Sequence, residues 1–433
     1  MIEVLSSREK SRLAIKLARI RNRNVAFDES LLSKVSRIIG DVRSRGDAAL
    51  LEYAKLFDDC VMQTAELRVD REDLRRTAGR VESEVLEAIR EAIRRVRAFH
   101  ALELQQSWLL ETAPGVFLGQ RITAIERAGL YVPGGTASYP SSVVMNVVPA
   151  QIAGVDRVIV ATPPRALEGN PAVAAALVEL EVTDVYAVGG AQAIAALAYG
   201  TETVPRVDKI TGPGNSYVTA AKKLVFGVVG IDSIAGPSEV VIVADDVARA
   251  SYVASDLLAQ AEHSKDASAI LLTTSNALAL EVVQELEIQT STLSRAELIE
   301  DSLTRYGAII VVDKMEEACV IINDLAPEHL QIMARDEEGI ASRIRNAGAI
   351  FFGPHSPAAV GDYLAGPNHV LPSGGAARFS SGLSVNDFLK RTNTVKFSAA
   401  ELTRTAPSIS ALAYAEGFDA HARSVLIRLE ENK

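Results

Sequence analysis

Residues 185–226, VYAVGGAQAIAALAYGTETVPRVDKITGPGNSYVTAAKKLVF, contain the pattern that decides the fold. Two short runs rich in apolar residues, 185–188 and 207–210, are each followed by a glycine-rich turn and then by a helical pattern, at 191–199 and 216–226. Alternation of strand and helix at this spacing is typical of parallel sheets with crossover helices. The stretch therefore predicts a doubly wound α/β unit.

The same alternation continues on both sides of this stretch. An apolar run at 158–160 and a helical pattern at 171–181 precede it. A second series of apolar runs, again separated by helical patterns, follows at 240–244, 269–272, 308–312 and 349–352. We therefore expect an α/β protein with two doubly wound, incomplete Rossmann-like parallel-sheet domains and small helical N- and C-terminal segments.

The remaining sequence has other periodicities. Apolar residues recur at helical spacing from residue 8 to about 105, a hairpin is expected around 116–125, and the chain becomes polar and helical after about 383. The predicted domains are an N-terminal helical segment (1–25), a discontinuous α/β domain (26–130 and 240–382), an inserted Rossmann-like domain (131–239) and a C-terminal tail (383–433).

Composition excludes several classes of function. The 433 residues carry a net charge of -10, which argues against a nucleic-acid partner because phosphate binding needs a basic face. The most apolar stretch, 142–160, is interrupted by Asn146 and Asp156, so we expect no membrane span, and the N-terminus has no apolar signal segment. Only Cys60 and Cys319 occur, which predicts reduced thiols in a cytoplasmic protein and excludes a thiolate zinc cluster.

Three glycine-containing loops follow predicted strands of the first α/β series. Loops at the carboxyl ends of parallel strands line the ligand crevice, and glycine lets a ligand approach the backbone. Tight turns alone would explain any one loop, and the third glycine of the dinucleotide fingerprint is replaced by Tyr217. Together the loops favour a cofactor site, and each has one polar candidate: Tyr131, Gln192 and Asn215.

Polar residues that suit metal ligation or acid–base chemistry are scattered over the second series. Asp256, Gln260 and His263 fall at i, i+4 and i+7 and share one stripe of a mostly apolar helix, where they need polar partners. Further candidates are the adjacent pair Glu328–His329, the loop residue Asp362, and Glu416 and His421 in the tail. Nitrogen and oxygen donors suit zinc without identifying it, and ordinary hydrogen bonds would also satisfy these groups.

Several blocks make the sequence recognisable beyond these patterns. They are RAGLYVPGGTASYPSSVVMNVVPA (127–150), VGGAQAIAALAYGTETVPRVDKITGPGNSYV (188–218), IDSIAGPSEV (231–240), DLLAQAEH (256–263), APEHL (326–330), GDYLAGPNHVLPSGG (361–375) and AEGFDAH (415–421). In content and order they resemble the histidinol dehydrogenase family over nearly the whole chain. The departures are minor, such as Ser373 where a threonine is usual.

The resemblance implies a homodimeric enzyme that oxidises L-histidinol through L-histidinal to L-histidine, the last step of histidine biosynthesis, with two NAD+ and one zinc ion per subunit. It implies that 131–239 binds NAD through Tyr131, Gln192 and Asn215, and that 26–130 with 240–382 carries the metal and the catalytic residues. The tail would contact the partner. The implied zinc ligands are Gln260, His263, Asp362 and His421. The implied acid–base pair is Glu328 and His329, and the implied substrate contacts are Ser238, Gln260, His263, His329, Asp362, Glu416 and His421. His421 and Glu416 would act in the partner's site, and the role of His369 is left open.

Three alternatives remain at this point. A paralogue in the same fold would oxidise another small polar alcohol, such as a sulfonated diol, although Glu416 in the substrate position argues against it. A zinc hydrolase would use the same ligands and the Glu328–His329 pair without a nicotinamide cofactor. A non-catalytic metal- or nucleotide-binding protein would not need that pair.

Overall fold

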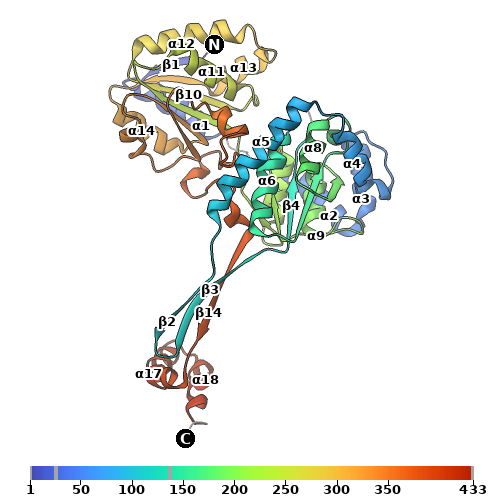
Figure 1. Cartoon of the computed structure of the whole chain (residues 1–433). Coiled ribbons are helices and arrows are strands. Elements are labelled where there is room, and N and C mark those ends of the chain that lie inside the picture. The colour runs from blue at the N-terminus through green and yellow to red at the C-terminus, as the bar shows by residue number, and fades with distance from the viewer. Residues whose placement is uncertain (1, 24–27, 135–138, 431–433) are drawn as a thin grey trace. The chain divides into compact units, whose positions relative to one another are not determined.

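The computed structural model describes residues 2–23, 28–134 and 139–430 (Figure 1). The chain divides into two compact units. Unit 1 comprises Met1–Glu103 and Ile125–Phe388, and unit 2 comprises Leu104–Ala124 and Leu389–Lys433. All but two of the residues proposed for the site from the sequence lie in unit 1.

The larger sheet of unit 1 has six parallel strands in the order β1-β11-β10-β9-β12-β13. Their bounds are β1 (Glu3–Ser6), β9 (Glu239–Ala244), β10 (Ser268–Thr273), β11 (Ala308–Val311), β12 (His329–Met333) and β13 (Ala349–Phe352). Every residue of β9 and β10 is buried, because helices cover both faces of the sheet. The helices of this part are α1 (Lys10–Arg21), α11 (Ala250–Ala261), α12 (Asn276–Thr290), α13 (Ala296–Tyr306), α14 (Met315–Leu325), α15 (Glu337–Ala341) and α16 (Ala358–Tyr363).

The smaller sheet of unit 1 has five parallel strands in the order β6-β5-β4-β7-β8. They are β4 (Arg127–Tyr131), β5 (Arg157–Thr162), β6 (Asp184–Ala187), β7 (Lys209–Thr211) and β8 (Gly230–Ile231). The helices between them are α6 (Pro140–Ala153), α7 (Pro164–Glu168), α8 (Pro171–Glu179), α9 (Gly190–Tyr199) and α10 (Ser216–Val225). Both α/β series predicted from the sequence are therefore present, and the predicted fold class is confirmed.

Four N-terminal helices complete the smaller sheet's two hydrophobic cores. They are α2 (Glu29–Arg45), α3 (Asp47–Phe57), α4 (Arg71–Ala78) and α5 (Ser83–His100). In α2 the apolar residues that recur at helical spacing form one buried face, as predicted. They are Val35, Ile38, Ile39 and Val42. Helices α2 and α3 share one core with α9 and α10, whereas α4 and α5 share the other with α6 and α8.

This packing differs from the division expected from the sequence, which placed 26–130 together with 240–382. Helical spacing identifies the apolar face of a helix but carries no information about which sheet that face will cover. Short 3-10 turns at Thr64–Leu67, Ala101–Glu103, Ala376–Arg378 and Val385–Phe388 join these elements.

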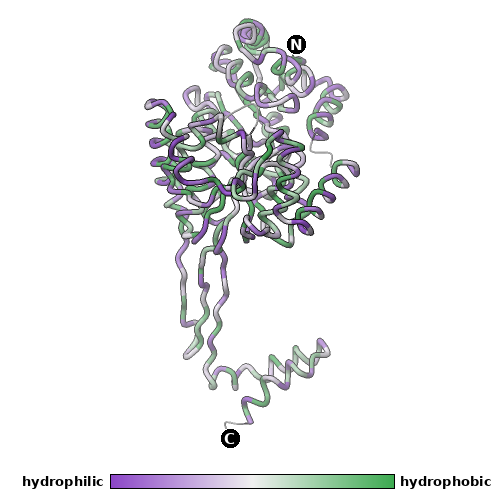
Figure 2. The backbone as a smooth tube through the Cα atoms, turned by 90° about the vertical axis from the view of Figure 1, so that its right-hand side faces the viewer, coloured by the Kyte–Doolittle hydropathy of each residue, from purple (hydrophilic) through white to green (hydrophobic). Residues whose placement is uncertain are grey.

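Unit 2 is built from an antiparallel sheet and two helices. Its strands, in the order β14-β3-β2, are β2 (Trp108–Ala113), β3 (Val116–Ala124) and β14 (Leu389–Lys396), and its helices are α17 (Ala399–Ala415) and α18 (Asp419–Glu430). The expected hairpin is the β2–β3 pair. Hydrophilic and hydrophobic residues are interspersed along these elements (Figure 2). Among the described residues, no helix has both the length and the apolar composition that a bilayer span requires.

Candidate functional site

Glu328 and His329 stand where the chain enters β12, next to β9 at the middle of the larger sheet. Both residues are buried, with 8% and 6% of their surface exposed. The pair lies at the amino ends of these strands, whereas ligands of open α/β sheets usually bind at the carboxyl ends. Buried polar groups need partners, so the neighbouring segment must supply them.

Glu239, the first residue of β9, supplies these partners through its backbone. Its N–H donates to Oε2 of Glu328 over 3.0 Å, and its carbonyl oxygen lies 3.2 Å from Nδ1 of His329. A proton on Nδ1 makes the second contact a hydrogen bond and leaves Nε2 as the basic nitrogen. One peptide segment therefore orients both candidate catalytic side chains.

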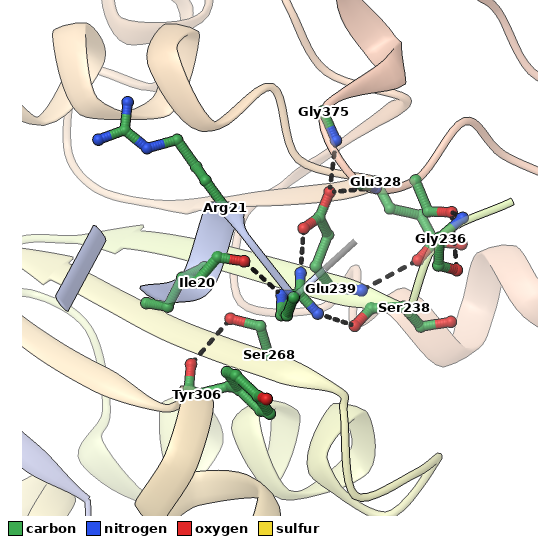
Figure 3. Close-up of polar contacts among 12 residues, drawn as sticks. Ile20, Arg21, Gly236, Ser238, Glu239, Ser268, Tyr306, Glu328 and Gly375 are labelled. Atoms are coloured by element: carbon green, nitrogen blue, oxygen red, sulfur yellow. Dashed lines mark hydrogen bonds and ion pairs between the residues drawn. The ribbon is translucent and has the colours of Figure 1, made fainter. Parts of the chain in front are cut away.

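The side chain of Glu239 is anchored in turn by a buried ion pair (Figure 3). Its carboxylate pairs with the guanidinium of Arg23 and accepts the N–H groups of Gly374 (3.0 Å) and Gly375 (3.4 Å). Arg23 also donates to the carbonyl oxygens of Ile20 and Ser238. Three segments distant in sequence are thus joined behind Glu328.

Burial dominates the electrostatics of the pair. It raises the pKa of Glu328 to about 7, and the hydrogen bonds from Glu239 N–H and the Ser238 side chain, together with the positive field of His263, only partly oppose it. Burial also lowers the pKa of His329, although Asp362 acts the other way, with Oδ1 3.9 Å from Nε2. A neutral imidazole is the form that can accept a proton.

Two of the four proposed zinc ligands, His263 and Asp362, lie near this pair, and the Gln260 carbonyl accepts the N–H of His263 over 3.3 Å. Gln260 is in the last turn of α11, His263 follows that helix with Nδ1 3.0 Å from the carbonyl of Ala259, and Asp362 is in α16. His263 and Asp362 both act electrostatically on Glu328. The described residues contain no group of three His, Cys, Asp or Glu side chains placed to hold a metal by themselves.

The donor chemistry nevertheless fits a metal. Gln260 is 3% exposed, and its Nε2 donor has no partner among the described residues, so an acceptor is missing there; its amide oxygen is the atom that a metal would take. An amide oxygen, an imidazole and a carboxylate are ligands that zinc accepts. The residues present are therefore compatible with the implied ion.

The polar stripe of α11 continues beneath the site. Burial raises the pKa of Asp256 to about 6, and the nearby amide of Gln331 in β12 acts against that shift. Gln331 is fully buried and two residues beyond His329, on the same face of the strand. Asp256 therefore lies behind the ligands as part of the packing between α11 and the sheet.

The three proposed NAD contacts line a single cavity of about 1150 Å³ at the carboxyl ends of the smaller sheet. Gln192 is buried in the first turn of α9. The hydroxyl of Tyr131 accepts the N–H of Gly190 over 3.0 Å, and burial raises the pKa of Tyr131 to about 12, with a smaller effect of Asp58. Asn215 caps α10 by accepting the N–H groups of Tyr217 and Val218, which leaves its amide N–H to donate to a ligand.

Gly212 sets the path of the loop that carries Asn215. Its φ is +111°, and a Cβ there would lie 2.1 Å from the carbonyl oxygen of Tyr131, so only glycine fits. Lys222 donates to the Gly212 carbonyl over 3.0 Å and pairs with Asp232, which accepts the Gly212 N–H over 2.8 Å. The loop is held from both sides against the end of β4.

The two tail residues belong to unit 2. Glu416 follows the last residue of α17, and His421 is in the first turn of α18, where its ring lies 5.1 Å from that of Phe418. Both are exposed. Ser238 belongs to unit 1 and contacts Glu328, as described above.

Sequence reasoning missed Arg23, Glu239 and the function of His369. Glu239 had a detectable signal, since a carboxylate opening the fully apolar run VVIVA must find a buried partner. His369, left open before, lies with Nδ1 2.9 Å from the Asp362 carbonyl and Nε2 3.5 Å from Ser142. It holds the loop that presents Asp362.

Two doubly wound sheets, one with a buried carboxylate–imidazole pair and the other with a large crevice at its strand ends, have the architecture of an α/β oxidoreductase. The family model for histidinol dehydrogenase matches residues 21–429. The chain is 51% identical to histidinol dehydrogenase of Geobacillus kaustophilus, covering 92% of this chain and 93% of that one, and 51% identical to that of Halalkalibacterium halodurans, covering 92% and 94%.

A crystal structure of histidinol dehydrogenase from Elizabethkingia anophelis superposes with a TM-score of 0.92 at 34% identity, over 99% of this chain and 98% of that one. The chain belongs to the histidinol dehydrogenase family. The resemblance found in the sequence blocks is thereby confirmed.

Removing one partner of the buried Arg23–Glu239 pair should destabilise the fold strongly, because the other charge is then left buried and unpaired. Glu239→Gln leaves a buried guanidinium without its counter-charge and should cost about 3–5 kcal/mol of unfolding free energy. The double variant Arg23→Met/Glu239→Gln should cost less than the sum of the single variants. Urea denaturation measures both. Asp246→Asn, which breaks the exposed pair with Arg335, is the control and should cost about 1 kcal/mol or less. Equal costs for Glu239→Gln and Asp246→Asn would contradict the assignment.

Asp256 should make stability depend on pH. Its pKa is about 6 in the folded chain against an ordinary 3.8, so the folded state binds more protons between those values. Stability should therefore fall as pH rises from about 4 to 6. Asp256→Asn should flatten that part of the curve of unfolding free energy against pH. Glu300→Gln, at an exposed position of α13, should leave the curve unchanged, and an identical wild-type slope in Asp256→Asn would refute the prediction.

Proposed function

We propose that the chain catalyses the NAD-linked, zinc-dependent oxidation of L-histidinol through L-histidinal to L-histidine, the last step of histidine biosynthesis. The observation that carries the proposal is the buried Glu328–His329 pair, fixed by the Glu239 backbone and facing Asp362. Relatives about 50% identical over most of the chain carry the name of this activity. Glu416 and Ser238 are the additional substrate contacts in this proposal.

His329 acts as the base of the alcohol step. Its carbonyl contact with Glu239 holds the proton on Nδ1, so Nε2 is free to take the hydroxyl proton of the substrate as the carbinol C–H bond breaks. The lowered pKa keeps the imidazole neutral before the reaction. Asp362 beside Nε2 stabilises the imidazolium that forms.

Glu328 acts in the aldehyde step. A carboxyl whose pKa is about 7 exchanges protons readily near neutral pH, so Glu328 is suited to deprotonate the water that hydrates the aldehyde. The hydrate then loses its proton and its C–H hydrogen in a second oxidation. Burial of the pair keeps bulk water away while the aldehyde is present.

Gln260, His263 and Asp362, with His421 of the partner subunit, would hold zinc, and Tyr131, Gln192 and Asn215 would hold NAD. When bound, the metal supplies a template for the nitrogen donors of the substrate and NAD+ supplies the hydride acceptor. The chain's own contribution is to orient the substrate between the ligands and His329. Two molecules of NAD+ are consumed for each L-histidinol.

Homodimerisation is part of the proposal. Unit 2 exposes large apolar side chains that a single copy leaves in water, including Leu110 (60%), Leu412 (67%) and Phe418 (51%). A second copy of the chain would cover such a surface, and Glu416 and His421 would then enter the partner's site. The two cysteines and the absence of a spanning helix among the described residues are compatible with the cytoplasmic location we propose.

The activity and the roles of the two histidines are tested together. Purified full-length chain should reduce two NAD+ per L-histidinol, and a chelator should abolish this reduction. His329→Asn should lower kcat at least about 100-fold with zinc content retained, whereas His263→Asn should lose the zinc, as measured by elemental analysis. His355→Asn, at an exposed loop position, is the matched control. Full metal content in His263→Asn would refute the ligand assignment, and NADH formation only with another alcohol would favour a paralogue.

The position of the tail residues is tested by subunit complementation. His329→Asn and His421→Asn should each be inactive alone. If each site combines unit 1 of one subunit with the tail of the other, co-expressed variants should regain about a quarter of wild-type activity, because half of the dimers are mixed and each holds one intact site. No recovery in dimers shown to be mixed would mean that His421 acts within its own subunit.

A further inference from the structure

Asp58 is a half-buried acid in the wall of the large cavity, and the catalytic scheme does not use it. It follows the last residue of α3, and the N–H groups of Asp58 and Cys60 both donate to the carbonyl of Ala54 over 3.1 Å. These bonds fix the turn and hence the direction of the side chain. Asp58 lines the same cavity as Tyr131, Gln192 and Asn215.

One oxygen of this carboxylate lacks a partner. Oδ2 of Asp58 is buried and accepts no hydrogen bond from any described residue. The adjacent Asp59, by contrast, pairs with Arg165. The guanidinium of Arg165 donates to the backbone oxygen of Asp59 (2.9 Å) and to Oδ2 of Asp59 (3.0 Å). Burial raises the pKa of Asp58, and Arg165 only partly opposes this effect. A buried acceptor without a donor is costly, and a hydroxyl group of a ligand would satisfy it.

The surroundings of Asp58 match the adenosine half of a dinucleotide. Phe57, half exposed, lines the same wall and offers an aromatic face on which a base can stack. Lys34 and Arg37 of α2 add positive charge to the cavity, which suits a pyrophosphate. The ribose joins the base to the pyrophosphate, so its hydroxyl groups are the donors that a carboxylate in this lining would meet.

We propose that Asp58 accepts a hydrogen bond from the 2′-hydroxyl of the adenosine ribose and makes the enzyme select NAD+ over NADP+. An acidic side chain plays this role in other dinucleotide-binding sites, at a different place in the fold. A 2′-phosphate would put like charges together in a partly desolvated cavity and would have no hydroxyl to donate. The inference rests on the proposed use of this cavity for NAD.

The first test compares the two cofactors in L-histidinol oxidation by the full chain. Asp58→Asn and Asp58→Ala should lower kcat/KM for NAD+ about 10-fold or more, as expected for a lost hydrogen bond to a charged group. The value for NADP+ should stay or rise, because Lys34 and Arg37 can then receive the phosphate. Asp59→Asn is the matched control, since its side chain pairs with Arg165, and it should keep the wild-type preference. An unchanged NAD+/NADP+ ratio in folded Asp58 variants overturns the inference.

The second test needs only the wild-type chain and a modified cofactor. 2′-Deoxy-NAD+ should bind about 10-fold more weakly than NAD+ to the wild type, measured by calorimetry. In Asp58→Ala the two should bind equally, since the hydroxyl has lost its acceptor. Equal binding to the wild type overturns the inference even if the variants do not fold.

The two proposals fail in different ways. If the wild-type chain oxidises L-histidinol with neither cofactor, the proposed function is wrong. If it uses NAD+ and NADP+ equally well, or if both lose affinity equally in Asp58→Asn, the function stands and the assignment of Asp58 to the 2′-hydroxyl is wrong.

Discussion

The backbone of Glu239 is the constraint on which the candidate site depends. Its N–H and carbonyl orient Glu328 and His329, and its carboxylate is anchored by Arg23 and by the amides of Gly374 and Gly375. A buried charge of this kind brings little net stability, because desolvation offsets most of the attraction. The ion pair between Glu239 and Arg23 matters instead because it fixes the position of the Glu239 backbone. Arg23 holds the start of β9, and the backbone there holds the acid–imidazole pair.

In the proposed function, chemistry and cofactor binding use different edges of two sheets. On the larger sheet the candidate catalytic pair lies at the amino ends of β9 and β12, and the proposed ligands come from α11, the turn after it and α16. On the smaller sheet the cavity follows the carboxyl ends of β4, β6 and β7, where glycine loops leave backbone N–H groups accessible. His369 and Asn368 connect the two parts, because they hold the Asp362 loop to Ser142 and to the Met145 carbonyl at the start of α6.

Two side chains that we propose to bind ligands each have a buried polar atom without a hydrogen-bond partner. Gln260 Nε2 and Asp58 Oδ2 are buried without a described partner, the first in the last turn of α11 and the second in the cavity wall. Folded chains seldom retain such atoms, since each costs free energy. In the proposed function, a bound ligand would offer an acceptor to the Gln260 N–H and a donor to Asp58, and part of that cost would then be recovered.

By itself the sequence determined the fold class, the helical faces such as that of α2, and, through long motif blocks, the family and the identity of the proposed ligands. These features are local: period, turn glycines and short motifs are properties of neighbouring residues. Only the tertiary structure decided that α2 to α5 cover the smaller sheet, that Arg23 meets Glu239 across 216 positions, and that Asp58 faces the same cavity as Asn215. Such contacts join residues far apart in the chain, and their geometry arises from the packing of whole elements, which no local pattern of residues encodes.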